Sequence, residues 1–211
     1  MTPSSNDAIQ TYQKYYLDRD YEQVDLWRLL RDRFGIGKAI YPGSYIQVSP
    51  SFIFPHVVYV DADKKAIKFF KGGSFNELVT ARKEYPQEPK IVFHGIDYRE
   101  LIDGYRSQFD LLISQYAGFI SNSCKPYLRK GGYLLVNNSH ADAGMASLDG
   151  DYQLIAAVHR SKGKYQLATA SLEGYFIPKK DVMVTRELLL EREKGVGYTK
   201  MAPLYLFQKV S

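Results

Sequence analysis

The chain has 211 residues, with a formal net charge of +5 at pH 7, a hydrophobic content of 45% and a charged content of 24%. These values are ordinary for a globular protein, and no apolar run approaches the ~18 residues that a membrane-spanning helix needs. The basic residues are scattered and mostly interleaved with acids, which favours a solvated surface over a phosphate-binding track. Nucleic acid therefore stays an alternative partner rather than the favoured one.

The N-terminal sequence MTPSSNDAIQ lacks the basic patch and the apolar stretch of a secretory signal, which predicts a cytoplasmic protein. Cys124 is the single cysteine, so it cannot form an internal disulfide and is expected to be a small buried side chain. The sequence has no pattern of histidine, cysteine or acidic residues that is typical of a metal site, and we expect none.

A helical pattern runs from about Asp7 to Phe34 and is ended by Gly35 and Gly37. Short apolar runs then alternate with helical segments, as in a parallel sheet that helices cover on both faces. The expected strands are residues 39–41, 57–60, 91–93, 111–113 and 133–136. The expected helices between them are residues 63–71, 75–85, 98–108 and 119–128.

The alternation of strand-like and helical segments ends after Asn138. Segments 153–159 and 165–171 are joined through Ser161, Lys162 and Gly163, which indicates a hairpin rather than a crossover. A helix at 185–194 and a final strand at 204–210 complete the chain.

These elements predict a three-layer, doubly wound α/β fold. Its sheet is mostly parallel and Rossmann-like, with the strand order 3-2-1-4-5 and an antiparallel C-terminal end. We expect a single domain over residues 1–211. Its parts are an N-terminal helical extension (1–37), a βα core (38–138), and a C-terminal hairpin, helix and strand (139–211).

A family resemblance begins at VVYVDAD, where a buried run ends in Asp61, about twenty residues after the strand and glycine turn IYPGS. The segments KIVFHGID, FDLLISQYAG and LRKGGYLLVNN follow in order. Together they resemble the core of the class I S-adenosylmethionine-dependent methyltransferases over residues 38–138. The resemblance implies an enzyme that transfers the methyl group of S-adenosylmethionine to a small-molecule or macromolecular acceptor, which the sequence does not name.

The cofactor loop departs from that family's pattern. Members usually carry an acid followed by G-x-G-x-G, whereas this chain has Tyr41, Pro42, Gly43, Ser44 and Tyr45. Gly43 is the only glycine that carries over. Two other functions therefore stay open. One is an inactive scaffold that binds a ligand or partner, and the other is a nicotinamide oxidoreductase, which the absence of G-x-G-x-x-G disfavours.

The resemblance also implies a cofactor site. Asp61 is expected to accept hydrogen bonds from both ribose hydroxyls, with a helix N-cap as its alternative, although Asp63 fits a cap better. Asp97 would accept from the adenine amino group or cap a helix that begins at Tyr98. The expected cofactor-binding residues are Tyr41, Pro42, Gly43, Ser44, Asp61, Ala62, Asp97 and Ser114.

Polar residues after the fourth and fifth strands are the candidates for the transfer site. Ser114, Gln115 and Tyr116 lie where the family's reacting groups converge, without the D/N-P-P-Y sequence that many amino-group methylating enzymes carry there. His140 and Asp142 follow the fifth strand, where they supply a general base or simply form a polar loop.

Overall fold

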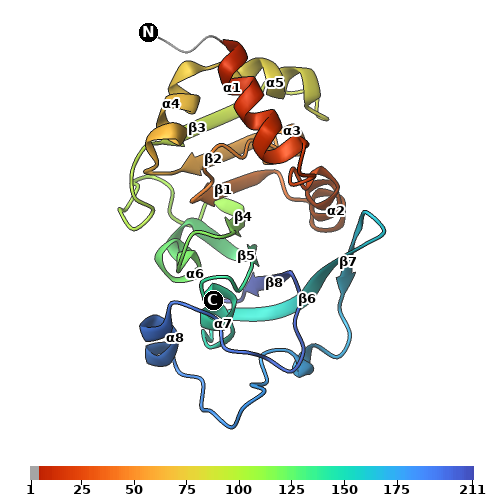
Figure 1. The fold of residues 1–211 in the computed structure, drawn as a ribbon, viewed down its shortest axis with the longest axis vertical. Coiled ribbons are helices and arrows are strands. Elements are labelled where there is room, and N and C mark those ends of the chain that lie inside the picture. Colours follow the sequence, from red (N-terminus) through yellow and green to blue (C-terminus); the bar gives the residue numbers. More distant parts are fainter. Residues whose placement is uncertain (1–4) are drawn as a thin grey trace. The chain divides into compact units, whose positions relative to one another are not determined.

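The computed structural model describes residues 5–211, which form two compact units with their boundary between Glu100 and Leu101 (Figure 1). The first four residues of the expected N-terminal extension lie outside this range. Among the described residues, no helix combines the length and the apolar character needed to cross a membrane.

The first unit holds three parallel strands, with β2 between β1 and β3 (Figure 1). Val57, Val58, Tyr59 and Val60 of β2 are buried, as expected for a central strand covered on both faces. Its elements are α1 (Ser5–Tyr12), the π-helical turn η1 (Gln13–Leu17), α2 (Val24–Phe34), β1 (Lys38–Pro42), α3 (Pro50–Ile53), β2 (His56–Val60), α4 (Lys64–Gly72), α5 (Phe75–Arg82) and β3 (Lys90–His94).

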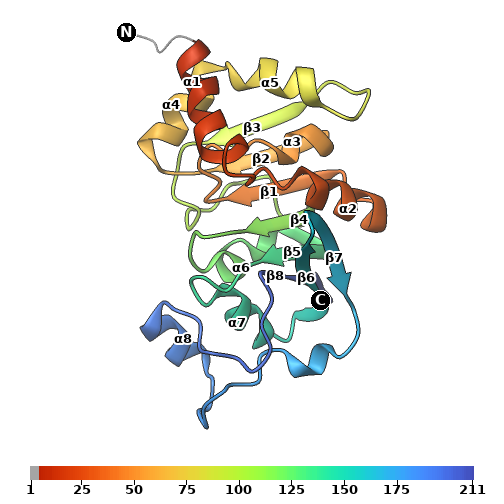
Figure 2. The same cartoon turned by 45° about the vertical axis from the view of Figure 1, so that its right-hand side comes forward.

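The second unit has the strand order β4-β5-β8-β6-β7, in which β4 and β5 are parallel and the remaining pairs are antiparallel (Figure 2). Lys162 and Gly163, both with positive φ, form the tight turn between β6 and β7. Its elements are β4 (Phe109–Ser114), α6 (Ile120–Ser123), η2 (Lys125–Tyr127), β5 (Leu128–Val136), α7 (Asp142–Ser147), β6 (Tyr152–Ser161), β7 (Lys164–Ala168), η3 (Leu172–Gly174), α8 (Arg186–Arg192) and β8 (Leu204–Lys209).

The predicted fold class is confirmed, because parallel βα units lead into an antiparallel C-terminal end. The predicted hairpin, the last helix and the last strand are present, and Cys124 is buried. Thr185, predicted as the first residue of that helix, is its N-cap, and its hydroxyl accepts the N–H of Leu188 at 3.2 Å.

The prediction of one helix over 7–34 is wrong, because the chain turns sharply between η1 and α2. Asp20 and Gln23 have positive φ there. The turn brings the Glu22 carboxylate to Arg82 of α5, with Nη1–Oε1 and Nη2–Oε2 distances of 2.5 and 2.8 Å. A continuous helix would not make this pairing, so a tertiary contact overrides the local pattern.

The helix predicted over 98–108 is absent, and that over 119–128 is reduced to α6 and η2. The backbone N–H groups of Ser107 and Gln108 donate to the carbonyls of Pro126 and Tyr127 instead of to a preceding helical turn. Gly104 and Ser107 also have positive φ. Pro126 has no N–H to continue α6, which explains why only short turns form there.

Candidate functional site

Asp61 follows β2 directly and joins the loops that follow β1 and β2. The chain turns at Gly43, whose φ of +65° suits glycine, and the Gly43 N–H donates to the Val60 carbonyl at 2.8 Å. The Asp61 Oδ2 accepts the Tyr45 N–H at 2.6 Å, and its Oδ1 accepts the Asp63 N–H at 2.8 Å. The Asp61 carboxylate therefore fixes the conformation of the loop that contains Gly43, the only glycine that matches the family's pattern.

Tyrosines from the N-terminal extension lie beside this carboxylate. The rings of Tyr15 and Tyr45 meet edge to face with centroids 5.6 Å apart. Burial raises the pKa of Tyr16, and the neighbouring Tyr45 and Asp61 raise it further. Burial and Tyr15 likewise raise the pKa of Tyr45 to about 12. The phenols of Tyr16 and Tyr45 therefore stay neutral near pH 7.

The rest of the loop after β1 is buried and held through side chains. The Gln47 amide donates to the Tyr21 carbonyl at 2.8 Å, and the Trp27 indole donates to the Ser49 hydroxyl at 2.9 Å. Ser44 is 2% exposed. The N-terminal extension thus packs onto the candidate cofactor loop.

Asp63 has the role of a helix cap. Its Oδ1 accepts the N–H groups of Lys65 at 2.7 Å and of Ala66 at 3.3 Å at the start of α4. This confirms the cap predicted from the sequence. Ala62, which lies between the two aspartates, is exposed.

Asp97 lies in a turn after β3. Arg99 donates to it through its backbone N–H, its Nε and its Nη2, at 2.9, 2.9 and 2.6 Å. These contacts lower the pKa of Asp97 to about 2. The alternative of a cap for a helix at Tyr98 is wrong, because no helix begins there.

In the second unit a buried carboxylate joins the segments that follow β4 and β5. The Asp142 Oδ2 accepts the Ser114 hydroxyl at 2.5 Å, and its Oδ1 accepts the Ser121 hydroxyl at 2.5 Å. The Ser121 N–H lies 3.1 Å from both oxygens. Burial raises the pKa of Asp142 to about 6, although the serine hydrogen bonds oppose the rise.

The other transfer-site candidates differ in exposure. Gln115 is buried, whereas Tyr116 is 73% exposed and has a φ of +60°. His140 is exposed. The Asn137 Oδ1 accepts the Ser139 hydroxyl at 2.9 Å and lies 3.4 Å from the Tyr116 N–H.

Two polar residues of this region were not singled out from the sequence. Asn137 directly follows β5, so the rule that selected Asp61 could have found it. Ser121 is one of three consecutive polar residues, with Asn122 and Ser123, and only its tertiary contact with Asp142 distinguishes it.

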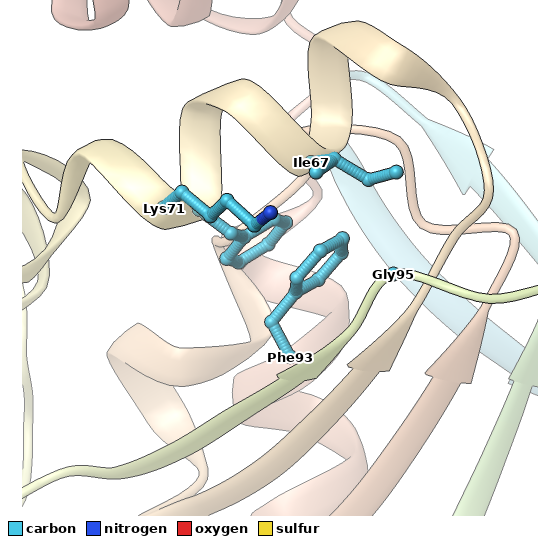
Figure 3. A pocket seen from close by; sticks show the side chains of 5 residues that line it. Ile67, Lys71, Phe93 and Gly95 are labelled. Carbon is cyan, nitrogen blue, oxygen red and sulfur yellow. The ribbon is translucent and has the colours of Figure 1, made fainter. Parts of the chain in front are cut away.

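A pocket of about 430 Å³ lies between α4 and the end of β3 (Figure 3). None of its lining residues was predicted to be a site residue, because the apolar pattern of α4 and β3 indicates residues of the hydrophobic core. The lining residues are Ile67, Phe70, Lys71, Phe93 and Gly95. Within residues 5–211, no three His, Cys, Asp or Glu side chains gather as a metal-binding group.

Solved structures that are similar to this chain include several methyltransferases. A methyltransferase from Geobacter sulfurreducens is 10% identical, with 99% of this chain and 91% of that chain covered and a TM-score of 0.52. A putative O-methyltransferase from Klebsiella pneumoniae is 11% identical, with coverages of 90% and 80% and a TM-score of 0.51. A putative S-adenosyl-L-methionine-dependent methyltransferase from Methanococcus maripaludis is 16% identical, with 64% of each chain covered and a TM-score of 0.44.

No protein-family model and no curated protein sequence matches the chain. At these identities the likeness is one of fold, and the chain has the Rossmann-like fold of the class I methyltransferases.

Proposed function

We propose that this protein is an S-adenosylmethionine-dependent methyltransferase whose first unit binds the cofactor. The observation that carries the proposal is the position of Asp61. It directly follows β2, the middle strand of the first unit, and its carboxylate holds the glycine turn that follows β1. In open α/β folds, ligands bind at the carboxyl ends of such strands.

The residues of the first unit suit the ribose of this cofactor. Each Asp61 oxygen accepts one backbone N–H, which leaves each of them a lone pair for a ribose hydroxyl. The residue is half-buried, so a diol can reach it. On this proposal Asp61 binds the ribose, Gly43 and Ser44 lie at the amino-acid end, and Asp97 lies at the adenine end.

When bound, the cofactor supplies a methyl group that passes to a nucleophilic acceptor by in-line displacement, a reaction that depends chiefly on positioning. The residues after β4 would orient the acceptor. Asp142 holds the Ser114 hydroxyl in place, and the exposed Tyr116 offers a ring and a hydroxyl for contact. His140, which is exposed, is the candidate base for an acceptor hydroxyl.

Titration calorimetry of the whole chain tests the proposal with three ligands. S-Adenosylmethionine and S-adenosylhomocysteine should bind with one site per chain, and NAD should not bind. Binding of NAD alone would indicate the oxidoreductase instead, and binding of none of the three would overturn the proposal. Binding of both adenosyl compounds, without methyl transfer to a panel of phenols, amines and carboxylic acids, would support the inactive scaffold.

Asp61→Asn tests the ribose contact. Charge-assisted hydrogen bonds contribute about 1.5–3 kcal/mol, so the dissociation constant for S-adenosylmethionine should rise about ten- to a hundredfold. Asp63→Asn is the matched control. It should bind within about twofold of the unsubstituted chain, because asparagine caps a helix as well as aspartate does. Equal binding by the two variants would show that Asp61 does not contact the cofactor.

The Asp61→Asn variant also needs its own stability measurement. An asparagine keeps one acceptor oxygen where Asp61 accepts two backbone N–H groups, so the free energy of unfolding should fall by about 1 kcal/mol. Urea unfolding separates this loss from the loss of binding. If Asp61→Asn and Asp63→Asn unfold at the same urea concentration, the hydrogen bond from the Tyr45 N–H to Asp61 contributes little to stability.

A further inference from the structure

The pocket between α4 and β3 has aromatic and aliphatic walls with a cation at one end. The Phe70 and Phe93 rings stack with centroids 4.2 Å apart and planes 9° from parallel. Figure 3 shows Phe93 pointing toward α4, the helix that carries Ile67 and Lys71. Lys71 is the one charged residue among the five that line the pocket.

The helix that carries this lysine is strongly basic. Its sequence, KKAIKFFKG, contains four lysines and no acid. Lys64, Lys68 and Lys71 recur at the spacing of one helix face, and all three are exposed. The nearest acid before the helix, Asp63, is engaged in capping it, and Asp97 after β3 is paired with Arg99. The charged side chains that α4 itself contributes beside the pocket are therefore all positive.

Gly95, which follows β3, lines the pocket close to Ile67. A Cβ atom at this position would lie 3.0 Å from Cγ1 and 3.4 Å from Cδ1 of Ile67. The backbone at Gly95 thus lies close to α4, and the part of the pocket beside the Phe93 ring is termed the slot. A volume of about 430 Å³ lies within the range of small-molecule sites.

We infer that this slot binds a small, flat aromatic carboxylate, with its ring against Phe93 and Ile67 and its carboxylate on the Lys71 amine. The aromatic walls select a planar apolar body, because aromatic rings pair favourably in stacked or edge-on arrangements. The lysine row selects negative charge. This inference does not depend on the proposed methyltransferase function, since none of the lining residues is an expected cofactor residue.

Calorimetry of the whole chain with 2-naphthoate tests the inference, with the neutral 2-naphthalenemethanol as the matched ligand. The carboxylate should bind one molecule per chain, and more tightly than the alcohol. Exposed charge pairs are worth up to about 1 kcal/mol, so Lys71→Met should weaken naphthoate about fivefold and leave the alcohol unchanged. Lys65→Met removes the same charge from an exposed position outside the lining, and it should change either affinity by less than about twofold.

Three outcomes would overturn the inference. The first is that naphthoate does not bind up to its solubility limit. The second is that Lys71→Met and Lys65→Met lose affinity for naphthoate to the same extent. The third is that S-adenosylhomocysteine displaces naphthoate. The third would place the ligand in the cofactor site. A Phe93→Leu variant that keeps the unfolding free energy within about 1 kcal/mol should also lose affinity for both naphthalene ligands. Unchanged affinity of Phe93→Leu for both ligands would show that the naphthalene ring does not contact Phe93.

Discussion

Asp61 and Asp63 show how neighbouring carboxylates acquire different roles from the groups that face them. The Asp61 carboxylate bridges two loops by accepting N–H groups that belong to different segments, whereas the Asp63 carboxylate accepts N–H groups from the first turn of its own helix. A bridge depends on tertiary structure and is open to a ligand's hydroxyls. A cap is local and satisfies helix donors that would otherwise lack partners.

The cap gives the first prediction. Asp63→Ala removes the acceptor of the Lys65 and Ala66 N–H groups and should lower the free energy of unfolding by about 1 kcal/mol. Asp63→Asn should lie within a few tenths of a kcal/mol of the unsubstituted chain. Urea unfolding at pH 7 measures both variants. Equal losses in the two would mean that the charge, and not the acceptor geometry, stabilises α4.

Asp142 gives the second prediction. Its pKa in the folded state is raised by burial from 3.8 to about 6, so the folded state holds this proton more tightly than the unfolded state does. Its contribution to stability is greatest below pH 4 and is lost as the pH rises to about 6. At about 1.4 kcal/mol per pH unit, the loss is about 3 kcal/mol.

Asp142→Asn keeps the size of the side chain and cannot ionise. Relative to the unsubstituted chain, its free energy of unfolding should therefore rise between pH 4 and pH 6 by up to about 3 kcal/mol. Urea unfolding at pH 4, 5, 6 and 7 gives this difference directly. A difference that does not vary with pH would show that the carboxyl titrates at its ordinary value.

Some of the site residues could be predicted from the sequence. An acid that ends an apolar run is conspicuous, so Asp61 was found together with the cap at Asp63. The network around Asp142 was not found, because Ser121 lies 21 residues earlier in a segment with no distinguishing pattern. Its role arises only when the segments after β4 and β5 fold against each other.

At the scale of elements, buried strands were predicted better than helices. The apolar residues of β1, β2 and β4 are conspicuous because the fold buries both faces of these strands. Helical periodicity also occurs in segments that do not become helices. Residues 98–108 were predicted to form a helix, yet the N–H groups of Ser107 and Gln108 pair with the carbonyls of Pro126 and Tyr127. The competing partner is distant in sequence, so a local pattern cannot reveal it.

The pairing of Glu22 with Arg82 gives the third prediction, at the turn that separates η1 from α2. Arg82 donates to both Glu22 oxygens, and its guanidinium lies 4.3 Å from the centroid of the Phe52 ring. Lysine can neither make the paired bonds nor stack in the same way. Arg82→Lys should therefore lower the free energy of unfolding by about 1–3 kcal/mol.

Arg28→Lys is the matched control, because Arg28 makes a similar paired contact with Glu84 at a more exposed site. The Glu84 side chain is 33% exposed, against 12% for Glu22. Exposed pairs contribute at most about 1 kcal/mol, so this control should cost less than Arg82→Lys. Equal costs measured by urea unfolding would mean that burial does not strengthen the Glu22 pair.

At the scale of the whole molecule, the pH dependence of stability is a sum over groups of opposite sign. His56, the first residue of β2, has its pKa lowered from 6.5 to about 4 by burial and by Lys38 and Lys90. The unfolded state therefore binds this proton more tightly. The contribution of His56 is fully present above pH 6.5 and is lost as the pH falls toward 4. Between pH 4 and pH 6 the His56 contribution to the free energy of unfolding rises with pH, whereas the Asp142 contribution falls.

The last prediction follows from these opposing slopes. His56 is partly exposed, so solvent screening reduces its contribution to about 1–2 kcal/mol, which is smaller than that of the buried Asp142. His56→Gln should gain stability relative to the unsubstituted chain as the pH falls from 6.5 to 4, which is the opposite trend to Asp142→Asn. The double variant lacks both of these pH-dependent contributions to the free energy of unfolding. Its difference in free energy of unfolding from the unsubstituted chain should equal the sum of the differences of the two single variants at every pH. Urea unfolding of the four proteins at pH 4, 5, 6 and 7 measures these differences. A His56→Gln difference with the same sign of slope as Asp142→Asn would mean that the histidine is protonated, and not neutral, in the folded protein at pH 5.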